Sequence, residues 1–208
     1  MTGTPRWFEH QSAAATEAGK THAQWYIDRF RTLAAEGMDL DGEARLVDAL
    51  VPRGARILDA GCGPGRLAGA LHHRGHDVVG VDVDPALIAA AEVDHPGPTY
   101  HVMDLATLDL PGDPFHLVVS AGNVMVFLAP GSERTVLARL SDHVRPGGRI
   151  VIGFRREPEA YSYARLDADA SAVELVLEHR FGTWDLDPFT DDSDFAITVL
   201  RVPTHLTT

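Results

Sequence analysis

The chain has 208 residues, of which 30 are acidic and 18 are lysine or arginine, so its formal net charge at pH 7 is −12. This charge argues against a nucleic-acid partner, because binding to a phosphate backbone depends on clustered basic side chains. A single cysteine, Cys62, excludes an internal disulfide and fits a reducing compartment. The sequence shows no secretory signal and no apolar run near the roughly 18 residues of a membrane span. Composition therefore predicts a soluble, cytoplasmic protein with no membrane partner.

The first quarter of the chain predicts two helices. Residues 20–36, "KTHAQWYIDRFRTLAAE", have the spacing of an amphipathic helix, which Gly37 ends. A shorter helix is expected from Gly42 to Val51, before Pro52.

Strands and helices then alternate along the chain. Apolar runs predict strands at 55–60, 76–82, 99–102, 116–121 and 149–154, and helical patterns lie between them at 65–74, 85–94 and about 131–145. A helix at about 160–174 precedes two further strands, within 175–184 and 194–202, that are expected to form a hairpin. The pattern predicts an α/β fold with a doubly wound, mostly parallel sheet that ends in an antiparallel pair.

A glycine-rich loop follows the first of these strands, in the stretch 57–71, "ILDAGCGPGRLAGAL". A loop between a strand and a helix directs backbone N–H groups at a ligand above the carboxyl edge of the sheet. A phosphate-binding P-loop is excluded because no Lys-Ser or Lys-Thr pair ends the loop. A dinucleotide fingerprint remains open: its third glycine would fall at Arg66 or Ala68, and Asp82 supplies the acid expected further on.

The fuller pattern, Asp59-x-Gly61-x-Gly63-x-Gly65, resembles the signature of class I S-adenosylmethionine-dependent methyltransferases. The resemblance extends from about residue 39 to 202. It includes acids at the ends of the second and third predicted strands, in "VGVDVD" and "YHVMDLATL", and the segments "HLVVSAGNVMVFL" and "LSDHVRPGGRIVIGF". It implies a Rossmann-like methyltransferase fold with a seven-stranded sheet, S-adenosylmethionine as cofactor, and methyl transfer as the activity.

The resemblance also implies roles for individual residues. The glycine loop would lie against the methionine part of the cofactor, Asp82 would accept hydrogen bonds from both ribose hydroxyls, and Asp104 and Leu105 would lie beside the adenine. The residues that it places at the cofactor are Asp59, Ala60, Gly61, Gly63, Gly65, Arg66, Asp82, Val83, Asp104, Leu105, Ala121 and Gly122.

The methyl acceptor is predicted to be a small molecule. The segment "AGNVMVFL" lacks the "NPPY" motif that is associated with transfer to exocyclic amines in nucleic acids. Candidate acceptor contacts are Asn123, Arg155 and Tyr161, and His22 and Tyr26 are candidates for a general base. No metal site is predicted, and the pattern names neither the acceptor nor an oligomeric state.

Three segments are expected by analogy with the family. Residues 1–51 would form a helical lid over the site, residues 52–203 the cofactor-binding core and residues 204–208 a tail. Two alternatives remain at this stage: a non-catalytic module that binds S-adenosylmethionine, and a nicotinamide-dependent oxidoreductase, for which no hydride-transfer residue is visible.

Overall fold

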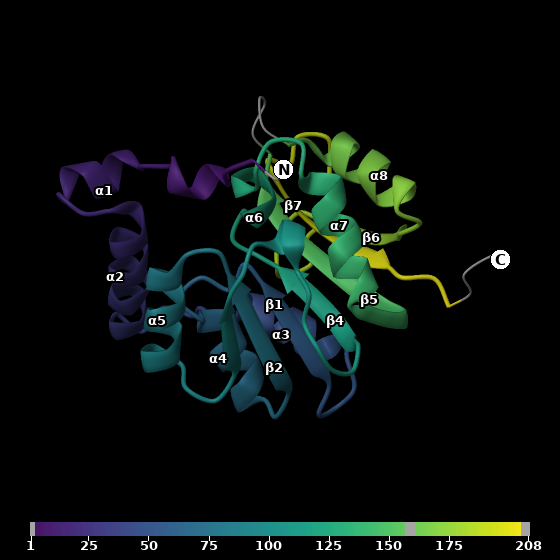
Figure 1. Cartoon of the computed structure of the whole chain (residues 1–208), viewed down its shortest axis with the longest axis horizontal. Coiled ribbons are helices and arrows are strands. Elements are labelled where there is room, and N and C mark those ends of the chain that lie inside the picture. The colour runs from purple at the N-terminus through teal and green to yellow at the C-terminus, as the bar shows by residue number, and fades with distance from the viewer. Residues whose placement is uncertain (1–2, 157–160, 205–208) are drawn as a thin grey trace.

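A computed structural model describes residues 3–156 and 161–204 of the chain. Within these residues seven strands form one sheet in the order β3-β2-β1-β4-β5-β7-β6 (Figure 1). Strands β1 to β5 pair in parallel, and β7 pairs antiparallel with both β5 and β6. The strands are Arg56–Ala60 (β1), Asp77–Asp82 (β2), Thr99–Val102 (β3), Phe115–Ser120 (β4), Val144–Arg155 (β5), Val176–Phe181 (β6) and Phe195–Arg201 (β7).

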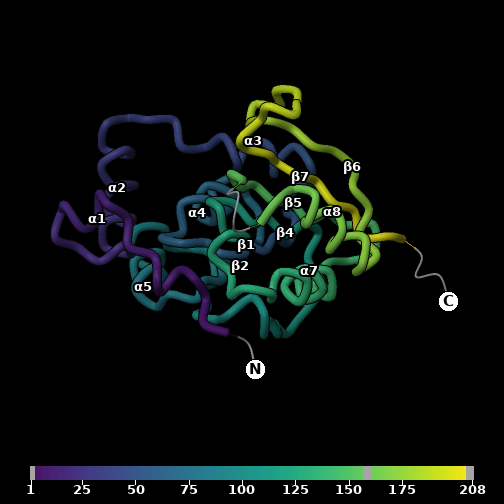
Figure 2. The backbone as a smooth tube through the Cα atoms, turned by 90° about the horizontal axis from the view of Figure 1, so that it is seen from above, coloured from purple at the N-terminus to yellow at the C-terminus, as the bar shows by residue number. Residues whose placement is uncertain are grey.

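Helices cover both faces of the sheet, as the alternation of strands and helices predicts. One core packs α3 and α4 against the sheet, and the other packs α7 and α8 against its opposite face (Figure 2). The helices are Ala13–Glu17 (α1), His22–Ala35 (α2), Gly42–Ala49 (α3), Arg66–His73 (α4), Pro85–Asp94 (α5), Val124–Phe127 (α6), Glu133–Asp142 (α7) and Tyr163–Ala172 (α8), with 3-10 turns at Arg6–Phe8 and Leu105–Thr107.

The two cores follow from the pleat of the central strands, in which successive side chains point to opposite faces. Leu58 and Val118 enter the core beneath α7, whereas their neighbours Ile57 and Val119 enter the core beneath α4. All four side chains are fully buried. A strand that is buried on both faces needs a nearly continuous apolar sequence, which these strands have.

The doubly wound sheet and the C-terminal antiparallel pair are confirmed. The strand β5 begins five residues earlier than predicted, because Val144 already pairs with Phe115 before a shift in register. The preceding helix α7 therefore ends at Asp142 rather than near residue 145. No described helix is long and apolar enough to cross a membrane.

Residues 3–41, the described part of the chain before α3, lie outside both large cores. The 3-10 turn and α1 were not predicted from the sequence, because the stretch 6–17 carries no apolar period. Side-chain hydroxyls cap the first two helices: Ser12 accepts a hydrogen bond from the Ala15 N–H at α1, and Thr21 accepts one from the Gln24 N–H at α2. The expected lid of residues 1–51 includes α3, but α3 packs in the same core as α4. Only the residues before α3 therefore remain as a proposed lid. Residues 205–208 of the expected tail lie outside the described part.

Candidate functional site

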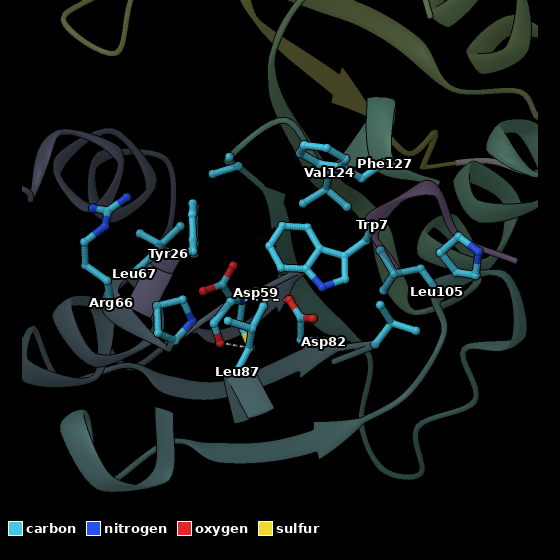
Figure 3. Close-up of a pocket in the computed structure, with 18 of the residues that line it drawn as sticks. Trp7, Tyr26, Asp59, Arg66, Leu67, Asp82, Leu87, Leu105, Val124 and Phe127 are labelled. Atoms are coloured by element: carbon cyan, nitrogen blue, oxygen red, sulfur yellow. Dashed lines mark hydrogen bonds between the residues drawn. The ribbon is translucent and has the colours of Figure 1, made fainter. Parts of the chain in front are cut away.

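A cavity opens above the carboxyl ends of β1, β2 and β4, beneath the N-terminal segment. Its empty space, which includes space open to solvent, is about 870 Å³. Figure 3 shows side chains from the sheet edge, from α2 and from the N-terminal turn converging on it. The lining residues that the sequence had singled out are Tyr26, Asp59, Gly61, Gly63, Arg66, Asp82, Val83, Asp104, Leu105, Ala121 and Gly122.

The glycine loop between β1 and α4 forms the floor of the cavity. Gly61 has a φ of +84°, and a Cβ there would lie 2.3 Å from a methyl carbon of Val124 in α6. Gly65 has a φ of +82°, and its Cβ would lie 2.7 Å from both Ala91 Cβ and the Tyr100 hydroxyl. These contacts are closer than real side chains allow, so glycine permits both the turn and the packing of the neighbouring elements. The loop backbone consequently stays exposed to the cavity.

Asp82, at the end of β2, ties this loop to the neighbouring strand. One carboxylate oxygen accepts a hydrogen bond from the Gly63 N–H at 2.8 Å, and the other accepts from the Asp84 N–H at 3.0 Å. Burial raises the pKa of Asp82 to about 6, although these backbone donors oppose the shift. Each oxygen retains a lone pair for a further donor.

Asp59 lies at the cavity with half of its carboxylate unpartnered. Its side chain is almost fully buried, and the Oδ2 atom has no hydrogen-bond partner among the described residues. Burial raises the pKa of this carboxyl to about 7, and the nearby Arg66 charge opposes the shift. A buried acceptor without a partner is costly, so this oxygen fits a cationic or hydrogen-bond-donating group of a ligand.

Arg66 lines the cavity at the end of the loop, but its guanidinium is already paired. It forms an ion pair with Glu43 of α3 at 2.5 Å and donates to the Leu40 carbonyl. Its cationic carbon also lies 5.2 Å from the centre of the Phe30 ring. Arg66 therefore joins α4 to the α2–α3 region.

The opposite end of the cavity is formed by the residues that follow β3. Asp104 accepts a hydrogen bond from the Ala106 N–H at 2.8 Å and so caps the 3-10 turn at Leu105–Thr107. Leu105 is buried beside Met103 and Val83 in the cavity wall. An apolar wall next to a carboxylate suits a flat heterocycle that carries an amino group.

Aromatic residues close the cavity on the side of the N-terminal segment. The Trp7 indole N–H donates to the Asp84 carboxylate at 2.8 Å, and the indole ring packs edge-on against Tyr26 and Phe127 (Figure 3). Sequence reasoning missed Trp7, because it stands in a stretch without helical or strand periodicity. Phe127 and Val124 also line the cavity; they belong to the segment "HLVVSAGNVMVFL", which the resemblance includes without singling out these two residues.

The two candidate bases differ in position. Tyr26 lines the cavity, and burial raises its pKa to about 12, so the phenol stays protonated at neutral pH. His22 does not line the cavity; its Nδ1 atom lies 3.2 Å from the Ser12 hydroxyl, and its ring packs against Trp7. Burial lowers the pKa of His22, and the charge of the nearby His10 lowers it further.

Three proposed acceptor contacts lie away from the cavity lining. Tyr161 is fully buried in the core beneath α8, where its hydroxyl donates to Asp169, so no acceptor contact is assigned to it. Arg155 forms an ion pair with Asp194 at the surface. The Asn123 side chain accepts from the Arg155 N–H at 2.7 Å, which occupies it in shaping the turn after β4. Two predicted cofactor residues, Ala60 and Gly65, also shape the site without lining the cavity.

Comparison with known proteins identifies the family. Residues 57–148 match the model of a methyltransferase domain. A solved TehB-like SAM-dependent methyltransferase from Corynebacterium glutamicum is 45% identical to this chain and superposes with a TM-score of 0.81, covering 86% of this chain and 97% of that one. The chain belongs to the class I S-adenosylmethionine-dependent methyltransferases. This family membership excludes the nicotinamide-dependent alternative and makes S-adenosylmethionine the cofactor of this methyltransferase.

Curated relatives agree with this chain at the level of the family. An uncharacterized methyltransferase of Mycobacterium tuberculosis is 37% identical over 51% of this chain and 54% of its own length. A ubiquinone biosynthesis O-methyltransferase of Alkalilimnicola ehrlichii is 29% identical over 69% of this chain and 64% of its own length. The chain thus spans about half the length of the first of these relatives and slightly less than two thirds of the second.

The residues of the cavity fit this cofactor. S-adenosylmethionine carries a sulfonium cation, an ammonium group, a ribose diol and an adenine. The unpartnered Asp59 oxygen and the Asp82 carboxylate provide acceptors and negative charge, and the pocket around Leu105 provides an apolar wall. The methyltransferase cavity therefore has a matching group for the sulfonium, the ammonium group, the ribose and the adenine of the cofactor.

Proposed function

We propose that this protein transfers a methyl group from S-adenosylmethionine to a small-molecule acceptor. The proposal rests on the cavity above the sheet, which has carboxylates at the sheet edge and aromatic side chains on the opposite side. The buried, free thiol of Cys62 supports a cytoplasmic location.

Each part of the cavity has a proposed role in holding the cofactor. Asp82 accepts from the ribose hydroxyls with the lone pairs that Gly63 and Asp84 leave free. Asp104 and Leu105 hold the adenine. Asp59 accepts from the ammonium group of the methionine arm, and the backbone of the glycine loop lies along this arm.

The side of the cavity that faces α6 supports an acceptor of limited size. Its wall consists of Trp7, Tyr26, Val124, Phe127 and Leu128, which are apolar apart from the Tyr26 hydroxyl and the indole N–H. Rings that meet across the opening leave room for a compact apolar group rather than for a folded macromolecular surface. A protein acceptor is the alternative, because one curated relative is a ribosomal protein L11 methyltransferase of Ralstonia pickettii.

The proposed catalysis rests on alignment. The cofactor supplies an activated methyl group on a good leaving group. This chain's residues orient the acceptor and exclude water, and orientation of this kind is worth several kcal/mol. The Tyr26 phenol, protonated at neutral pH, can donate a hydrogen bond to the acceptor but does not remove a proton from it. An acceptor whose attacking atom already has a free lone pair needs no further group.

Calorimetry with S-adenosylmethionine, S-adenosylhomocysteine and NAD tests the cofactor assignment; binding of the first two and not of NAD is expected. Turnover is then measured as release of S-adenosylhomocysteine with each of a panel of acceptors. The panel contains thiols, phenols, amines and heterocycles, and ribosomal protein L11 as a protein acceptor. Methylation of L11 alone would refute the small-molecule acceptor. Cofactor binding without turnover of any acceptor would favour a non-catalytic module that binds S-adenosylmethionine.

A further inference from the structure

The N-terminal turn Arg6–Phe8 crosses the cavity and brings one large side chain into it. Trp7 is half-buried, lines the cavity and lies in Figure 3 between the sheet-edge acids and α6. Its ring centre lies 4.8 Å from that of His22, 5.9 Å from that of Tyr26 and 5.5 Å from that of Phe127. The indole is therefore held between α2 and α6 over the space that the cofactor and the acceptor share.

One hydrogen bond fixes the indole to the cofactor side of this space. The Trp7 N–H donates to Asp84 Oδ2, while Asp84 Oδ1 accepts from the Ala86 N–H and caps α5. The Asp84 N–H in turn donates to Asp82. Because the two Asp84 oxygens serve different partners, the indole has an acceptor of its own, and a charged acceptor makes this the stronger kind of hydrogen bond.

We propose that Trp7 is a cofactor-binding residue, and that its hydrogen bond to Asp84 sets how long the bound cofactor is retained. The inference rests on the proposed function, because it takes the cavity to be the cofactor site. The indole covers the bound cofactor, and cofactor release requires the bond to Asp84 to break. An aromatic ring is also the cover that a sulfonium cation favours.

The test measures release of radiolabelled S-adenosylmethionine from the full chain after a chase with excess unlabelled cofactor. Trp7→Phe keeps a ring but loses the N–H, and Asp84→Asn keeps one oxygen, which cannot serve both Ala86 and the indole. Each variant is expected to release the cofactor about tenfold faster, as for a lost hydrogen bond to a charged group. Trp7→Ala, which also removes the cover, is expected to exceed both.

The double variant Trp7→Phe with Asp84→Asn distinguishes this bond from two independent effects. If both changes remove the same interaction, the double variant releases the cofactor no faster than the faster single variant. Trp184→Phe is the matched control, since this tryptophan lies against β5 outside the cavity, and its release rate should equal that of the parent. Unfolding midpoints without cofactor check that each variant is folded.

Release from Trp7→Ala within twofold of the parent would overturn the proposal, as would a double variant whose effect is the product of the single effects. Absence of any cofactor binding by the parent chain would instead refute the proposed function. The two failures are therefore distinguishable in one experiment.

Discussion

The carboxylate of Asp82 already accepts two backbone hydrogen bonds before any ligand is considered, and the residue lines the cavity. Replacement by alanine removes the proposed acceptor of the ribose hydroxyls and loosens the glycine loop at Gly63. We expect Asp82→Ala to weaken S-adenosylmethionine binding by about 1.5–3 kcal/mol, the scale of hydrogen bonds to a charged group. Calorimetry measures the change.

The control for this substitution is Asp77→Ala, at the other end of the same strand. Asp77 is exposed and pairs with Arg56 at the surface. It should bind the cofactor as the parent does. Parental affinity in Asp82→Ala would remove Asp82 from the cofactor site.

Asp59 has a pKa raised from 3.8 to about 7 by burial, which makes the stability of the cofactor-free protein depend on pH. Between these two values the folded state binds more protons than the unfolded state, so the free energy of unfolding falls as pH rises. We expect Asp59→Asn to flatten this fall and to raise the midpoint at pH 8 by about 2–4 °C. The same variant should bind S-adenosylmethionine more weakly at pH 8.

Thermal unfolding at pH 5, 6.5 and 8 checks the stability effect, with Asp77→Asn as the control at an exposed carboxylate. Asp82, whose pKa is also raised, leaves some pH dependence in the variant. If Asp59→Asn leaves the dependence of the unfolding midpoint on pH unchanged, Asp59 is not the source of this pH dependence.

The local sequence predicted the acids and glycines of the site, but it did not predict Trp7, the side chain that covers the cavity. Asp59 and Asp82 lie at the carboxyl ends of β1 and β2, and Asp104 follows β3 closely, so the chain order already brings them to one edge of the sheet. Trp7 bonds to a residue 77 positions away, and no local pattern announces such a contact. Tyr161 shows the converse error: a polar aromatic residue near the end of β5 is indistinguishable in sequence from one that turns into the core.

At the scale of elements, the start of α4 depends on Gly65. A Cβ there would meet α5 at Ala91 and β3 at Tyr100, in a backbone conformation that side chains disfavour. We expect Gly65→Ala to lower the free energy of unfolding by about 2–4 kcal/mol, through strain and overpacking together. Denaturant unfolding measures this loss.

Gly54 offers a matched comparison. Its φ is also positive, at +67°, but nothing lies within 4 Å of the position of its Cβ. Gly54→Ala should therefore lower the free energy of unfolding only through backbone strain, by about 1 kcal/mol. Equal losses in the two variants would show that packing at Gly65 contributes nothing.

The elements that sequence predicted well are those with long apolar runs. The central strands are buried on both faces and read as continuous apolar segments, which fixes their existence if not their ends. The start of β5 and the short helix α6 were not predicted, because "RPGG" and "NVMVF" carry no period long enough to distinguish strand, turn and helix. Tertiary pairing decides such segments.

At the scale of the whole molecule, residues 3–36, the described part of the N-terminal segment, contribute to neither of the two large cores. They contact the remainder mainly through a small cluster of Trp7, Tyr26 and Ile27 with α5, and through an ion pair of Arg31 with Asp94. We expect a chain that begins after residue 36 to keep a cooperative unfolding transition and its circular dichroism. It should lose at least about tenfold in cofactor affinity.

Unfolding of this shortened chain would show that the N-terminal segment belongs to the core and is no lid. Parental affinity for S-adenosylmethionine would show instead that the segment does not cover the cofactor. Either result is read from the same preparation by calorimetry and thermal unfolding.

Strand β7 has a consequence for how the molecule is made. It lies between β5 and β6, so β6 reaches the sheet only through a strand that follows it in the chain. On the ribosome, the parallel strands can assemble in the order of their synthesis, but the flank of β5 stays unpaired until residues 195–201 emerge. Premature termination before that point would leave an open strand edge, which recruits other chains. Strand β7 therefore completes the described sheet, because it covers the flank of β5 and provides the pairing edge for β6.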